Sequence, residues 1–191
     1  MDLLKCDMES GLDYYDAEGR VFPGIAKKVS AGEGLTGQDV LLILKWKLGR
    51  IRDSNLETVS DENLGMINQA VKAARTADSG VGALKTLDMI PGIGLATATA
   101  VLTVCYPTEF TIIDWRVLET LDLFPSRMPE NKRTEHNTEH WTAEDYIAEY
   151  LPRVKKQAHG WGCDLRDADR ALWGISVRNG ITRILGNPSR T

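Results

Sequence analysis

Residues 87–102 read LDMIPGIGLATATAVL, two apolar stretches separated by one proline and two glycines. Pro91 ends the helix that precedes it, because proline lacks the N–H that a helix interior needs and its ring clashes with the preceding turn. Gly92 and Gly94 allow a tight turn and leave no side chain in its way. Ile93 lies between them, and we expect it to pack into the core of the turn. The segment therefore predicts two helices joined by a short hairpin.

The second helix of this hairpin is rich in alanine, so the two helices can approach closely. The turn would leave the first N–H groups of that helix without partners, and the helix dipole there favours an anion. A DNA phosphate oxygen suits such donors whatever the base sequence. We therefore expect a helix-hairpin-helix at about residues 80–105 that binds the backbone of double-stranded DNA. The contacts would come from Gly92, Ile93 and Gly94. The alternative is a simple tight turn between two core helices.

The remaining sequence also has helical periodicity, with no strand pattern and no internal repeat. Thr36, Ser60 and Thr142 are placed to cap the helices that follow them. We expect helices at about residues 36–50, 60–74, 79–89, 94–105, 114–123, 142–158 and 164–178. The polar residues 125–141 should form a long flexible loop. The prediction is an all-α protein, one unit over residues 1–191 with compact helical lobes around a cleft.

Two of these helices contain residues that disfavour a regular helix. Pro152 should kink or split the helix that begins after Thr142. Asn179 and Gly180 should end the last helix, because both residues tolerate the left-handed conformation that commonly follows a helix C-terminus.

Composition limits the class of protein. The chain of 191 residues is 42% hydrophobic and 26% charged, which is typical of a folded domain. Its longest aliphatic run is too short to cross a bilayer, so we expect no membrane association. Three cysteines without C-x-x-C spacing favour neither disulfides nor a metal site and indicate a reducing, cytoplasmic environment. We expect a monomer. The net charge of −4 gives no general attraction to DNA, so phosphate contacts must be local.

A second motif follows the hairpin. Asp114 lies 23 residues after Pro91, in the sequence TIIDWRVLETL, and is placed to begin a helix. This arrangement resembles the helix-hairpin-helix (HhH-GPD) superfamily of DNA glycosylases, which includes the endonuclease III and adenine-mismatch glycosylase families. The similarity covers residues 80–123. The residues that follow the aspartate differ from the family's usual sequence pattern. Only the role of the aspartate is therefore transferred to this chain, at Asp114.

The resemblance implies that Asp114 is a catalytic carboxylate. Cleavage of an N-glycosidic bond develops positive charge on the sugar, which a fixed carboxylate stabilises while it orients the attacking water. The base must first leave the duplex. We therefore expect a DNA glycosylase of base-excision repair. Two alternatives stay open: Asp114 is only a helix cap, and the chain is a non-catalytic module that binds nucleic acid or a protein.

The resemblance also predicts which chemistry is missing. Relatives that cleave the strand carry a lysine early in the second hairpin helix, as a Schiff-base nucleophile. Ala96 occupies that position here, and no lysine lies between Met89 and Leu123. We therefore expect hydrolysis without strand cleavage. The four-cysteine cluster of many relatives is absent, so we expect no iron–sulfur cluster and no other cofactor.

A basic cluster ends the helix predicted at about residues 36–50. Lys45, Lys47 and Arg50 surround Trp46, with Arg52 nearby. Such a cluster can contact phosphates and stack on a base, although a solvated face with a half-buried tryptophan is the commoner arrangement. We include the three cationic residues as candidate DNA contacts.

Other polar residues favour structural roles. The sequence HNTEH at residues 136–140 fits an inverted zinc-peptidase motif but lies in the polar loop, where no helix would align its ligands, so no metal site is expected. Arg116 is expected either to face the cleft or to pair with Glu119. Trp161 and Trp173 are interpreted as packing residues, with a place in a cleft wall as the alternative. The last helix should carry surface ion pairs made by Arg166, Asp167, Asp169 and Arg170.

Overall fold

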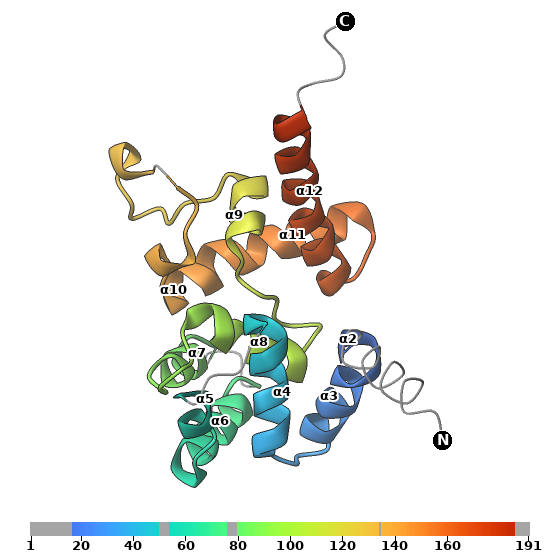
Figure 1. Cartoon of the computed structure of the whole chain (residues 1–191), viewed down its shortest axis with the longest axis vertical. Coiled ribbons are helices and arrows are strands. Elements are labelled where there is room, and N and C mark those ends of the chain that lie inside the picture. The colour runs from blue at the N-terminus through green and yellow to red at the C-terminus, as the bar shows by residue number, and fades with distance from the viewer. Residues whose placement is uncertain (1–16, 50–53, 76–79, 134, 186–191) are drawn as a thin grey trace, which may run out of the picture.

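A computed structural model describes residues 17–49, 54–75, 80–133 and 135–185 of the chain (Figure 1). Every regular element in these ranges is helical, which confirms the predicted fold class. The α-helices are α2 (Ala17–Arg20), α3 (Phe22–Ser30), α4 (Gly37–Leu48), α5 (Ser54–Thr58), α6 (Asp61–Ala73), α7 (Gly80–Asp88), α8 (Leu95–Cys105), α9 (Trp115–Leu121), α10 (Ala143–Asp145), α11 (Leu151–Trp161) and α12 (Leu165–Leu185). Short 3₁₀ turns lie at Glu130–Lys132 and Thr138–His140, and a π-helical turn at Tyr146–Tyr150.

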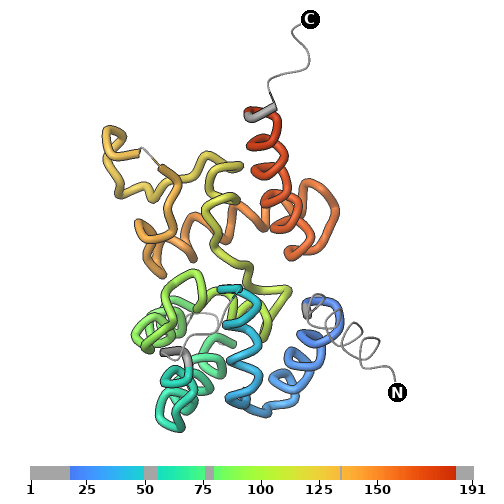
Figure 2. Tube along the Cα trace, in the orientation of Figure 1, coloured from blue at the N-terminus to red at the C-terminus, as the bar shows by residue number. Residues whose placement is uncertain are grey.

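The helices form two layers (Figure 1). Helices α2 to α8 make an N-terminal lobe, and α9 to α12 make a C-terminal lobe. Figure 2 shows the connection at residues 106–114 crossing from one lobe to the other. The buried hydrophobic residues of both lobes belong to one continuous core, so the described residues form a single unit.

Helix α8 is the centre of the N-terminal lobe. Its residues Thr97–Cys105 are all buried, as expected for a helix that is apolar on every side. Helices α3, α4, α6 and α7 pack around it. The threonines within α8 satisfy their hydroxyls inside the fold: Thr103 Oγ1 donates to the Thr99 carbonyl at 2.7 Å.

The predicted helix starts are confirmed. Thr36 and Asp39 form a reciprocal capping box at α4, and Thr142 and Asp145 form another at α10. The Ser60 side chain accepts a hydrogen bond from the first turn of α6. These caps need only residues three apart in sequence, which is why local patterns locate them.

The helix that contains Pro152 is divided, as predicted, although the chain stays helical through the proline. The chain is π-helical over Tyr146–Tyr150 and becomes α-helical at Leu151. A proline cannot donate the usual bond to the carbonyl four residues before it. The π turn changes the hydrogen-bond register just before this point, with the Leu151 N–H donating to the Tyr146 carbonyl.

The predicted end of the last helix is wrong. Helix α12 continues through Asn179 and Gly180 to Leu185. Its last turns are anchored, because Arg183 Nη1 lies 3.4 Å from Glu119 Oε1 of α9. The extended part of α12 therefore contacts α9, although an exposed ion pair of this kind contributes at most about 1 kcal/mol.

The polar segment 125–141 is tied to the C-terminal lobe at several points. Glu149 accepts hydrogen bonds from Ser126 N and Oγ, at 3.1 and 2.7 Å. Arg127 Nε donates to Asp145 Oδ2 at 3.0 Å. Trp141 is buried at the end of the segment.

Candidate active site

The predicted catalytic residue caps α9. Asp114 has extended backbone angles, and its Oδ1 accepts a hydrogen bond from the Arg116 N–H at 3.0 Å. Its second oxygen, Oδ2, lies 3.3 Å from Lys47 Nζ. The carboxylate is 21% exposed and the lysine side chain 16%. Asp114 is therefore a cap with one oxygen and an ion-pair partner with the other, and it stays accessible from one side.

Buried hydroxyls hold the chain that leads to Asp114. Tyr146 Oη donates to the Thr111 carbonyl at 2.6 Å and accepts from the Thr111 N–H at 3.1 Å. Tyr150 Oη donates to the Ile112 carbonyl at 2.6 Å. Burial raises the pKa of both phenols, so they remain protonated donors. The π-helical turn that presents these tyrosines thus fixes the approach to Asp114 from the C-terminal lobe.

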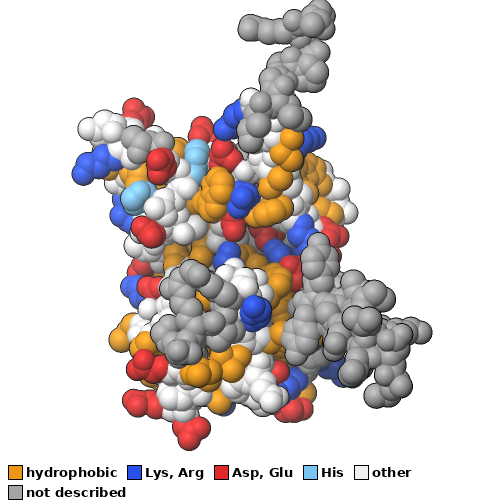
Figure 3. All heavy atoms as spheres, viewed as in Figure 1, with side chains coloured by type: hydrophobic (Ala, Val, Ile, Leu, Met, Phe, Trp, Pro, Cys, Tyr) orange, Lys and Arg blue, Asp and Glu red, His pale blue; other side chains and the backbone are white. Residues whose placement is uncertain are grey.

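A pocket of about 390 Å³ opens beside Asp114, between the two lobes. Acidic and basic side chains meet where the lobes join in the space-filling view (Figure 3). The pocket is lined by Glu18, Trp46, Lys47, Ile112, Asp114, Arg166, Asp169, Arg170 and Trp173. This volume is in the range of small-molecule sites, and three acidic residues face three basic ones.

An ion-pair network forms one wall of the pocket. Arg166 Nη2 lies 2.6 Å from Glu18 Oε1 and also pairs with Asp169. Arg170 Nε donates to Glu18 Oε2 at 2.9 Å. Burial acts to raise the pKa of Glu18, but Arg166 and Arg170 outweigh it and lower that pKa. The network joins α2 to α12, so the two ends of the described chain close the pocket together.

The prediction of surface ion pairs on α12 is wrong for half of these residues. Arg170 and Asp167 do pair on the surface, at 3.2 Å. Asp169 is instead 3% exposed. Burial raises its pKa to about 6, although Arg166 favours the charged form. Helical spacing identifies the pairs but does not say which side of α12 meets the other lobe.

Asp169 gives a pH-dependent prediction. Its pKa is raised in the folded protein above the usual aspartate value, so between about pH 4 and 6 the folded state holds a proton that the unfolded state releases. Its contribution to stability is full below about pH 4 and falls as the pH rises towards 6. We expect wild type to lose stability relative to Asp169→Asn across this window. The unfolding free energy of wild type minus that of the variant should therefore decrease and then level off. Urea denaturation at a series of pH values measures it; a difference that increases with pH would contradict the assignment.

Two exposed tryptophans flank Arg116, and one of them, Trp173, lines the pocket beside Asp114. Trp115 is 45% exposed and Trp173 is 43% exposed. The Arg116 guanidinium lies 4.3 Å from the first ring centroid and 5.0 Å from the second. Glu119, the other partner considered for Arg116, accepts instead from Ser176 Oγ at 2.5 Å. Trp173 forms part of a cleft wall, the second of the two roles considered for it, because its ring is 43% exposed and lines the pocket. Trp161, 47% exposed, is likewise not a core residue.

The hairpin has the expected geometry. Gly92 has a positive φ of 84°, and Ile93 is buried between two exposed glycines. Gly94 precedes α8 without a side-chain cap hydrogen bond, and the nearest side-chain atom to its Cβ position is Asp88 Oδ1, at 4.0 Å. The Thr58 hydroxyl donates to the Pro91 carbonyl at 2.7 Å and ties the turn to α5.

The two hairpin glycines should respond differently to substitution. Gly92→Ala places a side chain at positive φ and should lower the free energy of unfolding by about 1–2 kcal/mol. At Gly94 φ is −99°, and a Cβ would meet nothing closer than Asp88 Oδ1 at 4.0 Å. Gly94→Ala should therefore keep its stability, and it tests the predicted phosphate contact, because the methyl group would weaken duplex binding through the N–H donors. Urea unfolding and fluorescence anisotropy with labelled duplex measure the two effects. Unchanged binding by Gly94→Ala would argue against a phosphate contact.

The basic cluster at the end of α4 is divided. Lys47 faces Asp114. Exposed Lys45 instead donates to the Gly49 carbonyl at 3.1 Å, at the C-terminus of its own helix. Trp46 packs edge-on against Phe22, with ring centroids 4.9 Å apart. Arg50 and Arg52 lie outside the described residues. Lys45 and Lys47 differ because residues two apart on a helix point to different sides of it.

The first histidine of the HNTEH segment contacts an aromatic ring. His136 packs against Phe124 with the two rings tilted by 31° and their centroids 4.3 Å apart, and His140 is exposed. Within the described part of the chain no group of three or more His, Cys, Asp or Glu is arranged to hold a metal ion. No helix in the same ranges is long and apolar enough to span a bilayer.

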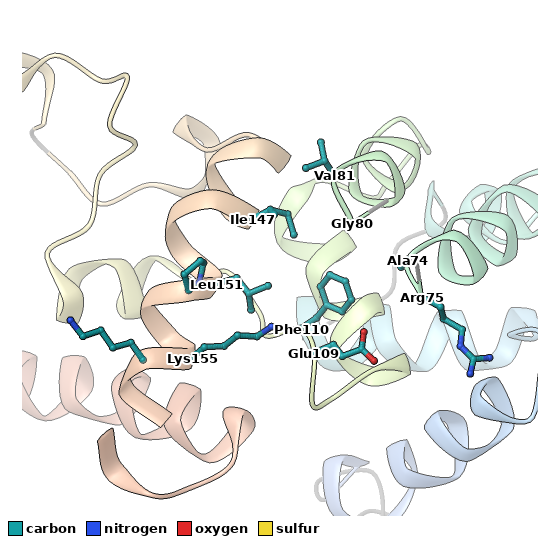
Figure 4. Close-up of a pocket in the computed structure, with 11 residues that line it drawn as sticks. Ala74, Arg75, Gly80, Val81, Glu109, Phe110, Ile147, Leu151 and Lys155 are labelled. Atoms are coloured by element: carbon teal, nitrogen blue, oxygen red, sulfur yellow. The ribbon is translucent and has the colours of Figure 1, made fainter. Parts of the chain in front are cut away.

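A larger pocket of about 670 Å³ lies elsewhere, between α11 and the α6–α7 region (Figure 4). Phe110, Ile147 and Leu151 give it an apolar wall, and Lys155 lies at one side. None of the predicted site residues lines it. The pocket beside Asp114 is smaller than this one, but it combines the carboxylate of Asp114, the amine of Lys47 and the indole of Trp173.

No family model matches the chain, and neither the curated proteins nor the solved structures give a match. Assignment of a function therefore depends on the hairpin motif and on the geometry of this pocket.

Proposed function

We propose that this protein is a DNA glycosylase that removes a flipped, modified base by cleaving its N-glycosidic bond at Asp114. The observation that carries the proposal is the position of Asp114: a helix-capping carboxylate that lines a base-sized pocket between two lobes. If Asp114 acted only as the N-cap of α9, it would not need to line a pocket. The hairpin at Gly92–Gly94 would supply a second element, a phosphate contact at the N-terminus of α8.

The chemistry follows from the charge that develops on the sugar. As the C1′–N bond breaks, C1′ and the ring oxygen become positive, and the Asp114 carboxylate stabilises that charge. Its Oδ1 is held by the Arg116 N–H, so the group is oriented before the substrate arrives. A base that has left the stack needs a planar apolar surface in exchange for its lost neighbours. The exposed ring of Trp173 lies in the pocket and can provide it.

Binding does not require a basic protein. The net charge is −4, and the pocket cations Lys47, Arg166 and Arg170 each pair with a carboxylate. Phosphate recognition would therefore depend on backbone N–H groups at the hairpin rather than on a basic surface. We expect duplex affinity to fall less steeply with salt than that of proteins that bind through many lysines and arginines.

The proposal is tested with the intact protein and a panel of duplexes, each carrying one modified base. Released base is measured directly by chromatography, and abasic sites are revealed with alkali. We expect one class of modified base to be released. If no base is released from any duplex while duplex binding persists, the alternative holds: a helix-hairpin-helix module that binds nucleic acid, with Asp114 as a cap.

A further inference from the structure

The pocket of about 670 Å³ takes no part in the proposed reaction, because Asp114 does not line it. It lies between the two lobes. The C-terminal end of α6 and the start of α7 border it on one side, and α11 with the π-helical turn borders it on the other. Sites for small molecules commonly have this volume and often lie between domains. The pocket therefore has the size and the position of a ligand site.

One side of α11 and of the turn before it provides most of the apolar wall. Ile147, Leu151 and Lys155 follow each other at intervals of four residues, and all three line the pocket. Phe110, which is 5% exposed, and Val81 add to the wall from the linker and from α7. Figure 4 shows the side chain of Lys155 extending from α11 toward Phe110. The apolar wall thus ends at an amine.

The charged side chains around this pocket are mostly basic. Arg75, Lys155 and Lys156 line it, and Glu109 is the single carboxylate among the lining residues. Within the described ranges none of the three cations forms an ion pair. The pocket beside Asp114 differs, because its cations are each paired with a carboxylate. Since the whole chain has a net charge of −4, this positive excess is local, and an anionic group would neutralise it.

We propose that this pocket binds a small organic carboxylate, with its apolar body against Phe110, Ile147 and Leu151 and its charged group beside Lys155. Both parts are needed. An exposed lysine alone holds an anion weakly, because water screens the charge. Apolar surface buried against the wall adds affinity, and the amine selects the anion over neutral or cationic molecules of the same shape. The inference is independent of the proposed function, since the two pockets share no lining residue.

Three compounds with the same apolar body and different charges test the site: 4-phenylbutyrate, 4-phenylbutanol and 4-phenylbutylamine. Each is titrated into the isotope-labelled full chain, and binding is followed through the amide signals of the NMR spectrum. We expect saturable shifts with the carboxylate, centred on Phe110, Ile147 and Leu151. The alcohol should bind about fivefold more weakly because it lacks the attraction to Lys155, and the amine more weakly still because Lys155 repels it.

Matched variants test whether the lysines select the anion. Lys155→Gln/Lys156→Gln removes two charges from the pocket and should weaken the binding of phenylbutyrate by about fivefold, to the affinity of the alcohol. Lys27→Gln/Lys132→Gln removes two charges from exposed positions that do not line the pocket, and it should bind phenylbutyrate as wild type does. All four lysines are exposed, so both variants should fold.

Three results would overturn the inference. The first is no saturable shift with phenylbutyrate, or shifts centred outside the pocket. The second is equal affinity for the carboxylate and the alcohol, since the lysines would then select nothing. The third is a shift of the same amide signals when the concentration of protein alone is raised, which would assign the apolar wall to a second copy of the chain. None of these results bears on base release, so the proposed function is tested separately.

Discussion

Replacing Asp114 with asparagine should lower the rate of base release by about 10²–10³-fold, the usual effect of removing one electrostatic stabiliser from an active site. Asparagine is nearly isosteric and caps helices as well as aspartate does, so the Arg116 N–H keeps its partner. The variant loses the negative charge that would stabilise the sugar cation and that pairs with Lys47. Single-turnover release of the base, with protein in excess over duplex, measures this chemical step.

The control lies at the other end of the same helix. Asp122 follows α9 with a φ of 49°, a conformation that asparagine also adopts readily. Its side chain is 88% exposed. Asp122→Asn should therefore release base at the wild-type rate. Equal rates for wild type and Asp114→Asn, with both proteins folded, would mean that Asp114 is a structural cap and that catalysis, if found, occurs elsewhere.

Tyr146→Phe should give the largest loss of stability among the residues that position the site. Removing this hydroxyl leaves both the N–H and the carbonyl of Thr111 without their buried partner. Each unsatisfied buried group costs about 1–3 kcal/mol. Base release should fall as well, because residues 111–113 lead directly into Asp114.

A matched variant tests whether the hydroxyl or the ring is responsible. Tyr150→Phe removes one hydrogen bond, to the Ile112 carbonyl, where Tyr146→Phe removes two. Both phenylalanines keep the stacked rings, whose centroids are 5.6 Å apart. We therefore expect Tyr150→Phe to lie between wild type and Tyr146→Phe in urea denaturation. The reverse order, or two stable variants with normal activity, would contradict the role given to these hydroxyls.

Much of the secondary structure could be predicted from local sequence. The caps at Thr36, Ser60 and Thr142 act over three residues, and each is present in the structure. The hairpin follows from Pro91 and Gly92, whose backbone preferences hold in any context. The extension of α12 beyond Gly180 could not be predicted in this way, because Arg183 is anchored to a different helix.

The pocket could be predicted only in part. Asp114 is predicted from its separation from the hairpin along the chain, and that separation is visible in one continuous segment of sequence. Arg166, Arg170 and Trp173 follow each other at helical spacing, so the stripe itself is visible in the sequence. The same spacing describes a solvated face, and nothing local shows that this stripe meets α2 and α4.

The amino-acid sequence therefore accounts for the helices, their caps, the bare turn at Gly92–Gly94 and the carboxylate of Asp114, because each depends on neighbours within a few residues or on one motif. The tertiary structure brings Lys47, Asp169 and Trp173 to that carboxylate. These residues belong to helices far apart along the chain, and their meeting depends on how two lobes pack around a shared core. The same packing, and not the hairpin segment, places Lys47 of α4 beside Asp114.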